Sequence, residues 1–308
     1  MRSHEVALII LTITLGSLSF GKHTIFGTPT LDGTMYVNMV LAFRGEIGFH
    51  TIDAPFTYRP MTPFLASLLP FSPEFSISFL NTLFCVIMVL TIYWTCRELD
   101  IDDDSSFKAS IAFAISWNIL LYGSAVHIDT GLVMCWSLFI LAAIREEKFV
   151  VLLSIGIVAV LFKEVALVMS LSIMPSSKIK GMIVLSVQTT IALAIRFIMA
   201  LGTAWEGTFG YLWWIDISRN LNLAVLIESF FSLALIVPIS YLGYINSKNY
   251  HLLQFIVPAF LVIIIGFLYG AFCGRFIWMF QVALAPLFAE GMKFISSYQT
   301  LDSVQMDS

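Results

Sequence analysis

The chain has 308 residues, of which 59% are hydrophobic, and its mean hydropathy is +0.91. Charged residues make up 12% of the chain, against roughly 25% in soluble domains, which excludes a soluble cytosolic enzyme. The net charge of −4 and the lack of a Lys/Arg-rich tract argue against nucleic acid as a partner. The composition predicts a single transmembrane domain over residues 1–308.

The apolar runs are continuous, which predicts an all-α polytopic transmembrane helical bundle, because a membrane β-barrel would show short alternating segments. The clear runs cover residues 6–20, 75–96, 109–124, 131–144, 182–201, 221–245, 252–272 and 276–294. The first run also fits a signal peptide with Arg2 as its basic flank. The many apolar runs that follow favour a retained first helix.

Residues 149–174 form an ambiguous run, because Lys163 and Glu164 lie in its middle. They are either a buried ion pair in one span or the turn of a hairpin of two short helices. The hairpin places nine basic residues inside and six outside, whereas a single span gives seven on each side. The nine are Arg2, Arg97, Lys108, Arg145, Lys148, Lys178, Lys180, Lys248 and Lys293.

This charge bias favours about ten spans with both termini in the cytoplasm, and with Arg196 inside a span. Residues 296–308 are then a polar cytoplasmic tail. The segments outside are a long first loop at residues 21–71, a loop at 202–220, and short turns near His127 and Arg275. We expect the protein in a cell membrane or, in a eukaryote, in the endoplasmic reticulum.

The first external loop is long enough to be functional in its own right. Asp32 precedes apolar residues at helical spacing, namely Met35, Tyr36, Met39, Val40 and Phe43, which predicts a helix on the membrane surface. Asp32 is therefore either the N-cap of that helix or a catalytic acid. Both roles are compatible with one residue.

The loop ends in a run that contains Tyr58, Arg59 and Pro60, in which prolines fix the backbone beside the bilayer. Arg59 is either a rigid donor to an anion or a cation that extends to the head groups. Lys163 and Glu164 are likewise either functional or a structural ion pair.

No nucleotide-binding, hydrolase or metal-binding motif is present in the sequence. We therefore expect no metal cofactor. The alternative is a divalent cation held by His50, Asp53, His127 and Asp129, whose spacing matches no tight metal motif.

Together these features resemble the GT-C class of polytopic membrane glycosyltransferases, including the protein O-mannosyltransferase and aminoarabinose transferase relatives that use polyprenyl-phosphate sugars. The resemblance rests on three local features: Asp32 with Tyr36, Tyr58-Arg59-Pro60 with Pro63, and Lys163-Glu164 followed by Arg275-Phe276. One departure is that Gly33 follows Asp32, where many relatives have a second acid.

The resemblance implies that Asp32 is the catalytic general base and that Arg59, Lys163 and Arg275 bind the phosphate of the donor. Second acids or substrate contacts would be Asp53, Tyr58, Asp129 and Glu164. The implied partners are a polyprenyl-phosphate sugar donor, a lipid, glycan or protein acceptor at the external or luminal face, and membrane lipids.

Two other functions compete with this one. A transporter or lipid flippase would line its pathway with Lys163, Glu164 and Arg196. A non-catalytic GT-C-like subunit would bind a lipid or stabilise a partner enzyme, and its function would survive Asp32→Asn.

Overall fold

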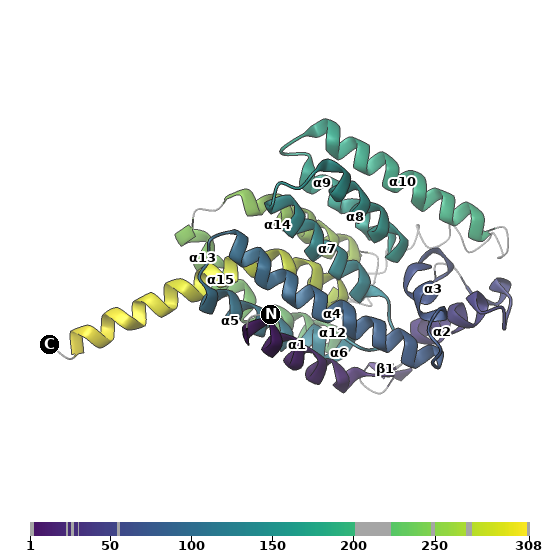
Figure 1. Cartoon of the computed structure of the whole chain (residues 1–308), viewed down its shortest axis with the longest axis horizontal. Helices are drawn as coiled ribbons and strands as arrows, with labels where there is room; N and C mark the ends of the chain where they lie inside the picture. The colour runs from purple at the N-terminus through teal and green to yellow at the C-terminus, as the bar shows by residue number, and fades with distance from the viewer. Residues whose placement is uncertain are drawn as a thin grey trace.

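The computed structural model describes residues 3–22, 24–25, 28–29, 31–53, 56–200, 223–247, 250–268 and 273–306. Within these residues the fold is all-helical apart from one small hairpin, in which strands β1 (Thr24–Ile25) and β2 (Thr28–Pro29) pair antiparallel. Figure 1 shows the helices packed into a bundle, from which the C-terminal helix projects. The predicted all-α class is confirmed, and the loop expected at residues 202–220 lies outside the described residues.

The helices that the structure describes are α1 (Ser3–Gly16), α2 (Leu31–Phe43), α3 (Met61–Ser67), α4 (Pro73–Glu98), α5 (Asp103–Ala114), α6 (Trp117–Tyr122), α7 (Asp129–Ile144), α8 (Phe149–Phe162), α9 (Met169–Ile173), α10 (Lys178–Ala200), α12 (Leu223–Leu233), α13 (Ile236–Ser247), α14 (Leu253–Leu268) and α15 (Cys273–Met306). Short 3₁₀ turns lie between them: η1 (Ser17–Ser19), η2 (Phe49–Thr51), η3 (Phe56–Tyr58), η4 (Glu164–Val168) and η7 (Tyr250–Leu252). Within the described ranges, three helical segments are long and apolar enough to cross a membrane: Pro73–Glu98, Lys178–Met199 and Ser229–Ser247.

Three predicted elements differ from the observed ones. The run at residues 109–124 is broken into α5 and α6, because Ser116 has an extended backbone (φ −61°, ψ 148°). The run at residues 221–245 is divided between α12 and α13. The expected polar tail at residues 296–308 is helical as far as Met306, since the sequence after Gly291 has no glycine or proline to end the helix.

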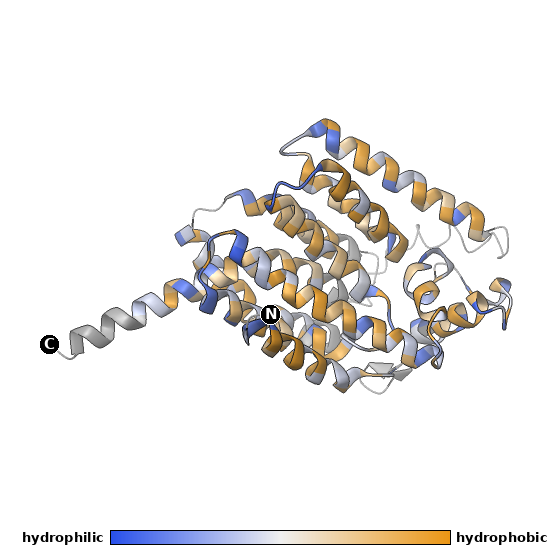
Figure 2. Ribbon diagram, in the orientation of Figure 1, coloured by the Kyte–Doolittle hydropathy of each residue, from blue (hydrophilic) through white to orange (hydrophobic). Residues whose placement is uncertain are grey.

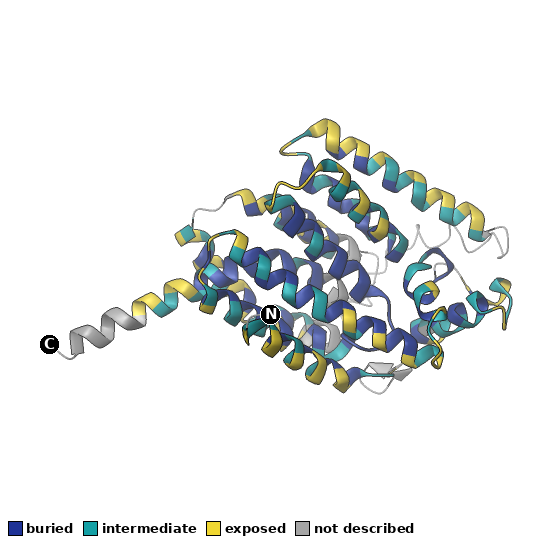
Figure 3. Ribbon diagram, in the orientation of Figure 1, coloured by how far each residue is buried: buried dark blue, intermediate teal, exposed yellow. Residues whose placement is uncertain are grey.

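Helix α10 lies at the edge of the bundle and is apolar on its outer face (Figures 1 and 2). Only 11% of its apolar window is buried, against 67% for α4. Leu193, Phe197 and Ile198 of α10 are each more than half exposed. Figure 3 shows exposed stretches, in yellow, along α10. Such a surface would be unstable in water and suits contact with lipid chains.

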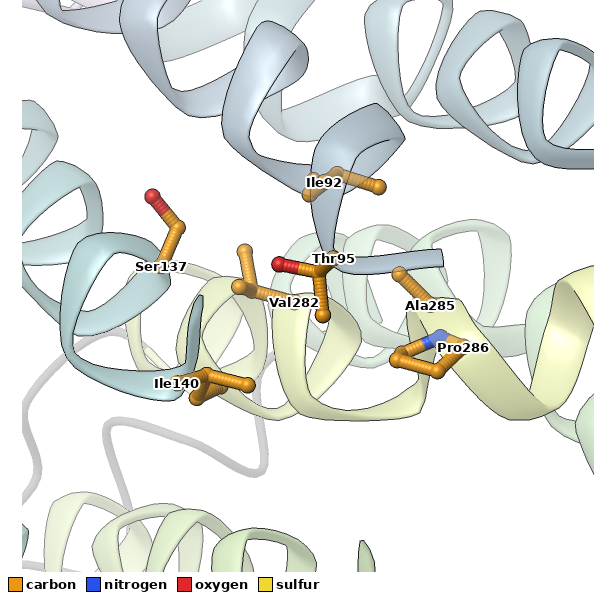
Figure 4. A pocket seen from close by; sticks show the side chains of 7 residues that line it. All are labelled: Ile92, Thr95, Ser137, Ile140, Val282, Ala285 and Pro286. Atoms are coloured by element: carbon orange, nitrogen blue, oxygen red, sulfur yellow. The ribbon is translucent and has the colours of Figure 1, made fainter. Parts of the chain in front are cut away.

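The interior around α4 is tightly packed. Trp136 of α7 is fully buried and donates a hydrogen bond from Nε1 to the carbonyl of Met279 in α15 (3.1 Å). Figure 4 shows a crevice between α4, α7 and α15, which Thr95, Ser137 and Pro286 help to line. This crevice has essentially no room for a water molecule, so it is a packing defect and not a substrate site.

The bundle has two ends, which we call the loop end, where α2 and α3 lie, and the terminal end, where α1 begins.

Helices α8 and α10 run in the same direction, because Lys180 Nζ near the start of α10 lies 5.9 Å from the ring centroid of Phe149 at the start of α8. The chain between them must therefore turn back. It does so at Lys163, whose backbone is extended (φ −165°, ψ 138°). Residues 149–174 are thus a hairpin, and the single-span alternative is wrong.

Candidate functional site at the loop end

Helix α2 forms the first part of the site. The spacing predicts the helix correctly, but its apolar residues pack into the protein interior. Tyr36, Met39 and Val40 are at most 1% exposed, and the ring of Tyr36 packs edge-on against Phe56 with 5.5 Å between centroids. Asp32 is one helical turn before Tyr36, so both side chains lie on one face. Asp32 is the second residue of α2 and not its N-cap, a position where the helix dipole still stabilises a carboxylate.

Arg59 follows η3 and joins α2 to the hairpin. Its Nη2 and Nε donate to the two carboxylate oxygens of Glu164 at 2.9 and 3.2 Å, and its Nη1 donates to the Tyr36 hydroxyl at 3.2 Å. The Arg59 side chain is 14% exposed. Arg59 is therefore held in a two-bond pair with a carboxylate and does not extend toward the head groups.

Lys163 forms a second ion pair beside the first. Its Nζ lies 2.5 Å from Asp129 Oδ1, and both side chains are 5% exposed. The pair forms where the end of α8 meets the start of α7, and Gly131 permits this approach. A Cβ on Gly131 would lie 2.3 Å from the ring of Phe162, so no larger residue fits there.

The two pairs contain two acids and two cations, and Asp32 is a third acid close to Tyr36. Burial raises the pKa of the Tyr36 hydroxyl, Arg59 opposes this effect, and the nearby carboxylates of Asp32 and Asp129 add to it. Tyr36 therefore remains protonated through the physiological range. Because its oxygen accepts from Arg59, its own proton stays available to a further acceptor.

The other predicted site residues have different positions. Tyr58 is buried, and the guanidinium carbon of Arg196 lies 5.6 Å from its ring centroid. Asp53 is exposed on the surface after η2 and has no described contact with the network. Arg275 is in the first turn of α15, and its side chain lies outside the described residues.

Two features of the site were not predicted as parts of it. Arg196, expected inside a span and named only for the competing transport pathway, adds a third cation near the site at the loop end. Asn81 of α4 holds the turn before α7 by donating from Nδ2 to the carbonyls of Ala125 and His127 at 2.8 and 2.7 Å. A lone amide in the apolar run at residues 75–96 was the available signal for Asn81.

Several buried hydroxyl groups near the network have no hydrogen-bond partner in the described structure. They belong to Thr57 and Tyr58 beside Arg59, to Thr62 of α3, and to Thr130 beside Asp129. Buried polar groups are costly without a partner, so these positions suit a polar ligand or bound water. Among the described residues, no group of three His, Cys, Asp or Glu side chains is placed to hold a metal ion.

No family model and no curated protein sequence matches this chain. The GT-C resemblance therefore stays a prediction from local sequence features.

Proposed function

We propose that the protein is a membrane glycosyltransferase that moves a sugar from a polyprenyl-phosphate donor to an acceptor at the external or luminal face. The observation that carries the proposal is the convergence of Asp32, Tyr36, Arg59 and the Lys163-Glu164 turn at one end of an apolar bundle. A membrane-embedded transferase needs an acid and several cations at such a boundary.

In the proposed reaction, Asp32 is the general base. It takes the proton from an acceptor hydroxyl or amine as that group attacks the anomeric carbon of the sugar. The bond between this carbon and the phosphate oxygen breaks, and the polyprenyl phosphate leaves with the electron pair. Asp32 is suited to this role because it lies on the same face of α2 as Tyr36, which contacts Arg59. The base is thus on the same side of the helix as the proposed phosphate contact.

Arg59 is the main proposed contact to the donor phosphate. A guanidinium group has five N–H donors, and Arg59 directs three of them at Glu164 and Tyr36. Two donors remain for a phosphate, and the Tyr36 proton provides a third. Low exposure strengthens these interactions, because charge is poorly screened at the membrane edge. Lys163 and Arg275 are the further proposed phosphate contacts, and Arg196 adds positive charge nearby.

The remaining acids have supporting roles in this proposal. Glu164 and Asp129 hold Arg59 and Lys163 in place when no phosphate is bound, and they also balance buried positive charge. Tyr58 contacts the substrate in this proposal, and Asp53 serves as a second acid or substrate contact. We propose no metal in the reaction.

For the membrane topology, we propose about ten passes, with both termini in the cytoplasm and the loop end outside. The reversal at Lys163 and the excess of Lys and Arg predicted at the terminal end support this orientation. The protein would reside in a cell membrane or in the endoplasmic reticulum.

Two observations favour competing functions. The Lys163–Asp129 pair is buried in an apolar bundle, which is also the pattern of a flippase or transporter pathway. Both Arg59 and Lys163 are already paired with carboxylates, which is also what a non-catalytic subunit with structural ion pairs would show.

The test is an assay of the purified protein in liposomes with a panel of polyprenyl-phosphate sugars. We expect sugar transfer and an equal amount of released polyprenyl phosphate. Movement of the intact donor between leaflets without release would identify a flippase. Donor binding without release or movement would identify an accessory subunit, and either result would contradict the proposal.

A further inference from the structure

A polar cavity lies at the terminal end, at the other end of the bundle from the network around Arg59. It has a volume of about 230 Å³ and is lined by Glu5 of α1, by Tyr93, Trp94, Arg97 and Glu98 of α4, and by Arg145 at the end of α7. Two acids and two cations line it, so its formal charge is zero. The proposed transfer reaction makes no use of it.

The charged groups of this cavity have hydrogen-bonding capacity left over. Arg145 donates from both Nε and Nη2 to the same oxygen of Glu98, Oε1, at 2.8 and 2.6 Å. In the described structure the other oxygen, Oε2, accepts no hydrogen bond, and Arg145 Nη1 donates none. Arg97 donates from Nη1 to the carbonyl of Ile101, which leaves its Nη2 without a described acceptor. The cavity therefore offers cationic donors and an anionic acceptor close together.

Trp94 provides an aromatic wall for the cavity. Its Nε1 donates to Glu5 Oε1 at 3.0 Å, which fixes the indole ring between α1 and α4. Tryptophan is enriched at membrane interfaces, and its ring face attracts an ammonium group. A cationic head group thus has an aromatic surface close to Glu98.

An apolar stripe on α1 starts next to the cavity. Val6, Ile10 and Ile13 follow Glu5 at helical spacing and are 41%, 60% and 48% exposed. Lipid chains can lie along such a stripe while their head group reaches the cavity.

We propose that this cavity binds phosphatidylethanolamine from the surrounding leaflet. Its phosphate accepts from Arg97 and Arg145, its ammonium donates to Glu98 Oε2 beside the Trp94 ring, and its acyl chains follow α1. Phosphatidylcholine has no N–H to donate to Glu98, and phosphatidylglycerol brings no positive charge to Glu98. Of the three lipids, phosphatidylethanolamine is the one that matches both the two arginines, through its phosphate, and Glu98, through its primary ammonium group.

The test is native mass spectrometry of the full chain, stripped of lipid, with the three lipids at equal acyl composition. We expect phosphatidylethanolamine to bind on the order of tenfold more tightly than either other lipid, as a charge-assisted hydrogen bond predicts. Glu98→Gln should reduce its affinity to that of phosphatidylcholine and leave phosphatidylcholine unchanged. Arg145→Gln should weaken all three lipids.

The matched control is Asp104→Asn, which removes an exposed acid paired with Lys108 at the same end but outside the cavity. It should leave the lipid preference intact. Equal binding of the three lipids by the wild type would overturn the proposal even if a variant failed to fold. A preference for phosphatidylethanolamine that survives Glu98→Gln would also overturn the proposal. Equally tight binding of soluble glycerophosphoethanolamine would show that the ligand is a free metabolite and not a membrane lipid.

Discussion

At the loop end, the role of each charged residue depends on the residue with which it pairs. Arg59 contacts both Tyr36 and Glu164, so it connects the first loop to the α8 hairpin across 105 residues of sequence. Lys163 and Glu164 are neighbours in sequence but pair with different partners. A change at any one of these side chains therefore alters a shared network, and conservative substitutions give the clearest results.

Arg59→Lys tests whether the guanidinium geometry is used to bind phosphate. Lysine keeps the charge but cannot form two parallel bonds to Glu164 and still reach a phosphate. We expect KM for the lipid donor to rise about tenfold, with a smaller fall in kcat. Steady-state transfer rates provide the measurement, and Lys148→Arg, in the turn before α8, provides the control. An unchanged KM would remove Arg59 from the donor site.

Tyr36→Phe tests the role of the Tyr36 hydroxyl. Because burial raises the pKa of Tyr36 above its ordinary value near 10, the group stays protonated across pH 6–9. It can therefore donate its proton while its oxygen accepts from Arg59. The variant should bind donor several-fold more weakly and keep the shape of its pH–rate profile. If the alkaline limb of that profile disappears in the variant, Tyr36 ionises in the reaction and this account of it is wrong.

At the scale of elements, helices α4, α7 and α10 follow from uninterrupted apolar runs, and the structure has them within a few residues of the predicted bounds. The break between α5 and α6 was not predictable, because serine at position 116 is not a strong helix breaker. The site was predicted in pieces. Arg59 and Glu164 were both identified, but their pairing depends on which helix ends meet in space, and no local pattern encodes that.

The contact between α13 and α15 depends on two glycines, Gly243 of α13 and Gly291 of α15. A Cβ on Gly243 would lie 1.8 Å from the carbonyl oxygen of Leu287, a backbone atom that cannot move aside locally. Gly243→Ala should therefore lower the unfolding temperature strongly, with a cost of about 2 kcal/mol or more. The control is Gly156→Ala in α8, where the nearest atom is a side-chain atom, Gln188 Nε2, at 3.0 Å. Equal melting temperatures for the two variants, measured in detergent, would contradict the observed packing.

At the scale of the whole molecule, the bundle has a charged network at each end and apolar faces between them. The exposed apolar surface of α10 and the three long apolar helices suit a bilayer. The loop end has the groups suited to transfer chemistry, and the terminal end has the cavity suited to a lipid head group. The proposed orientation therefore separates substrate chemistry from lipid binding by the thickness of the membrane.

Labelling of single cysteines tests this orientation. In a background with all four native cysteines replaced by serine, cysteine is introduced at one of three exposed positions, Asp53, Glu147 or Ser297. A membrane-impermeant maleimide should label position 53 in intact cells, and positions 147 and 297 only after permeabilisation. Labelling of all three from one side would contradict the proposed topology.

The central claim is that Asp32 removes a proton from the acceptor as the sugar leaves its lipid phosphate. The most direct measurement is polyprenyl phosphate release in liposomes by wild type and by Asp32→Asn, with donor binding measured in parallel. The account predicts that release falls by about 10²–10⁴-fold while donor binding and the unfolding temperature stay unchanged. Undiminished release by Asp32→Asn would contradict it.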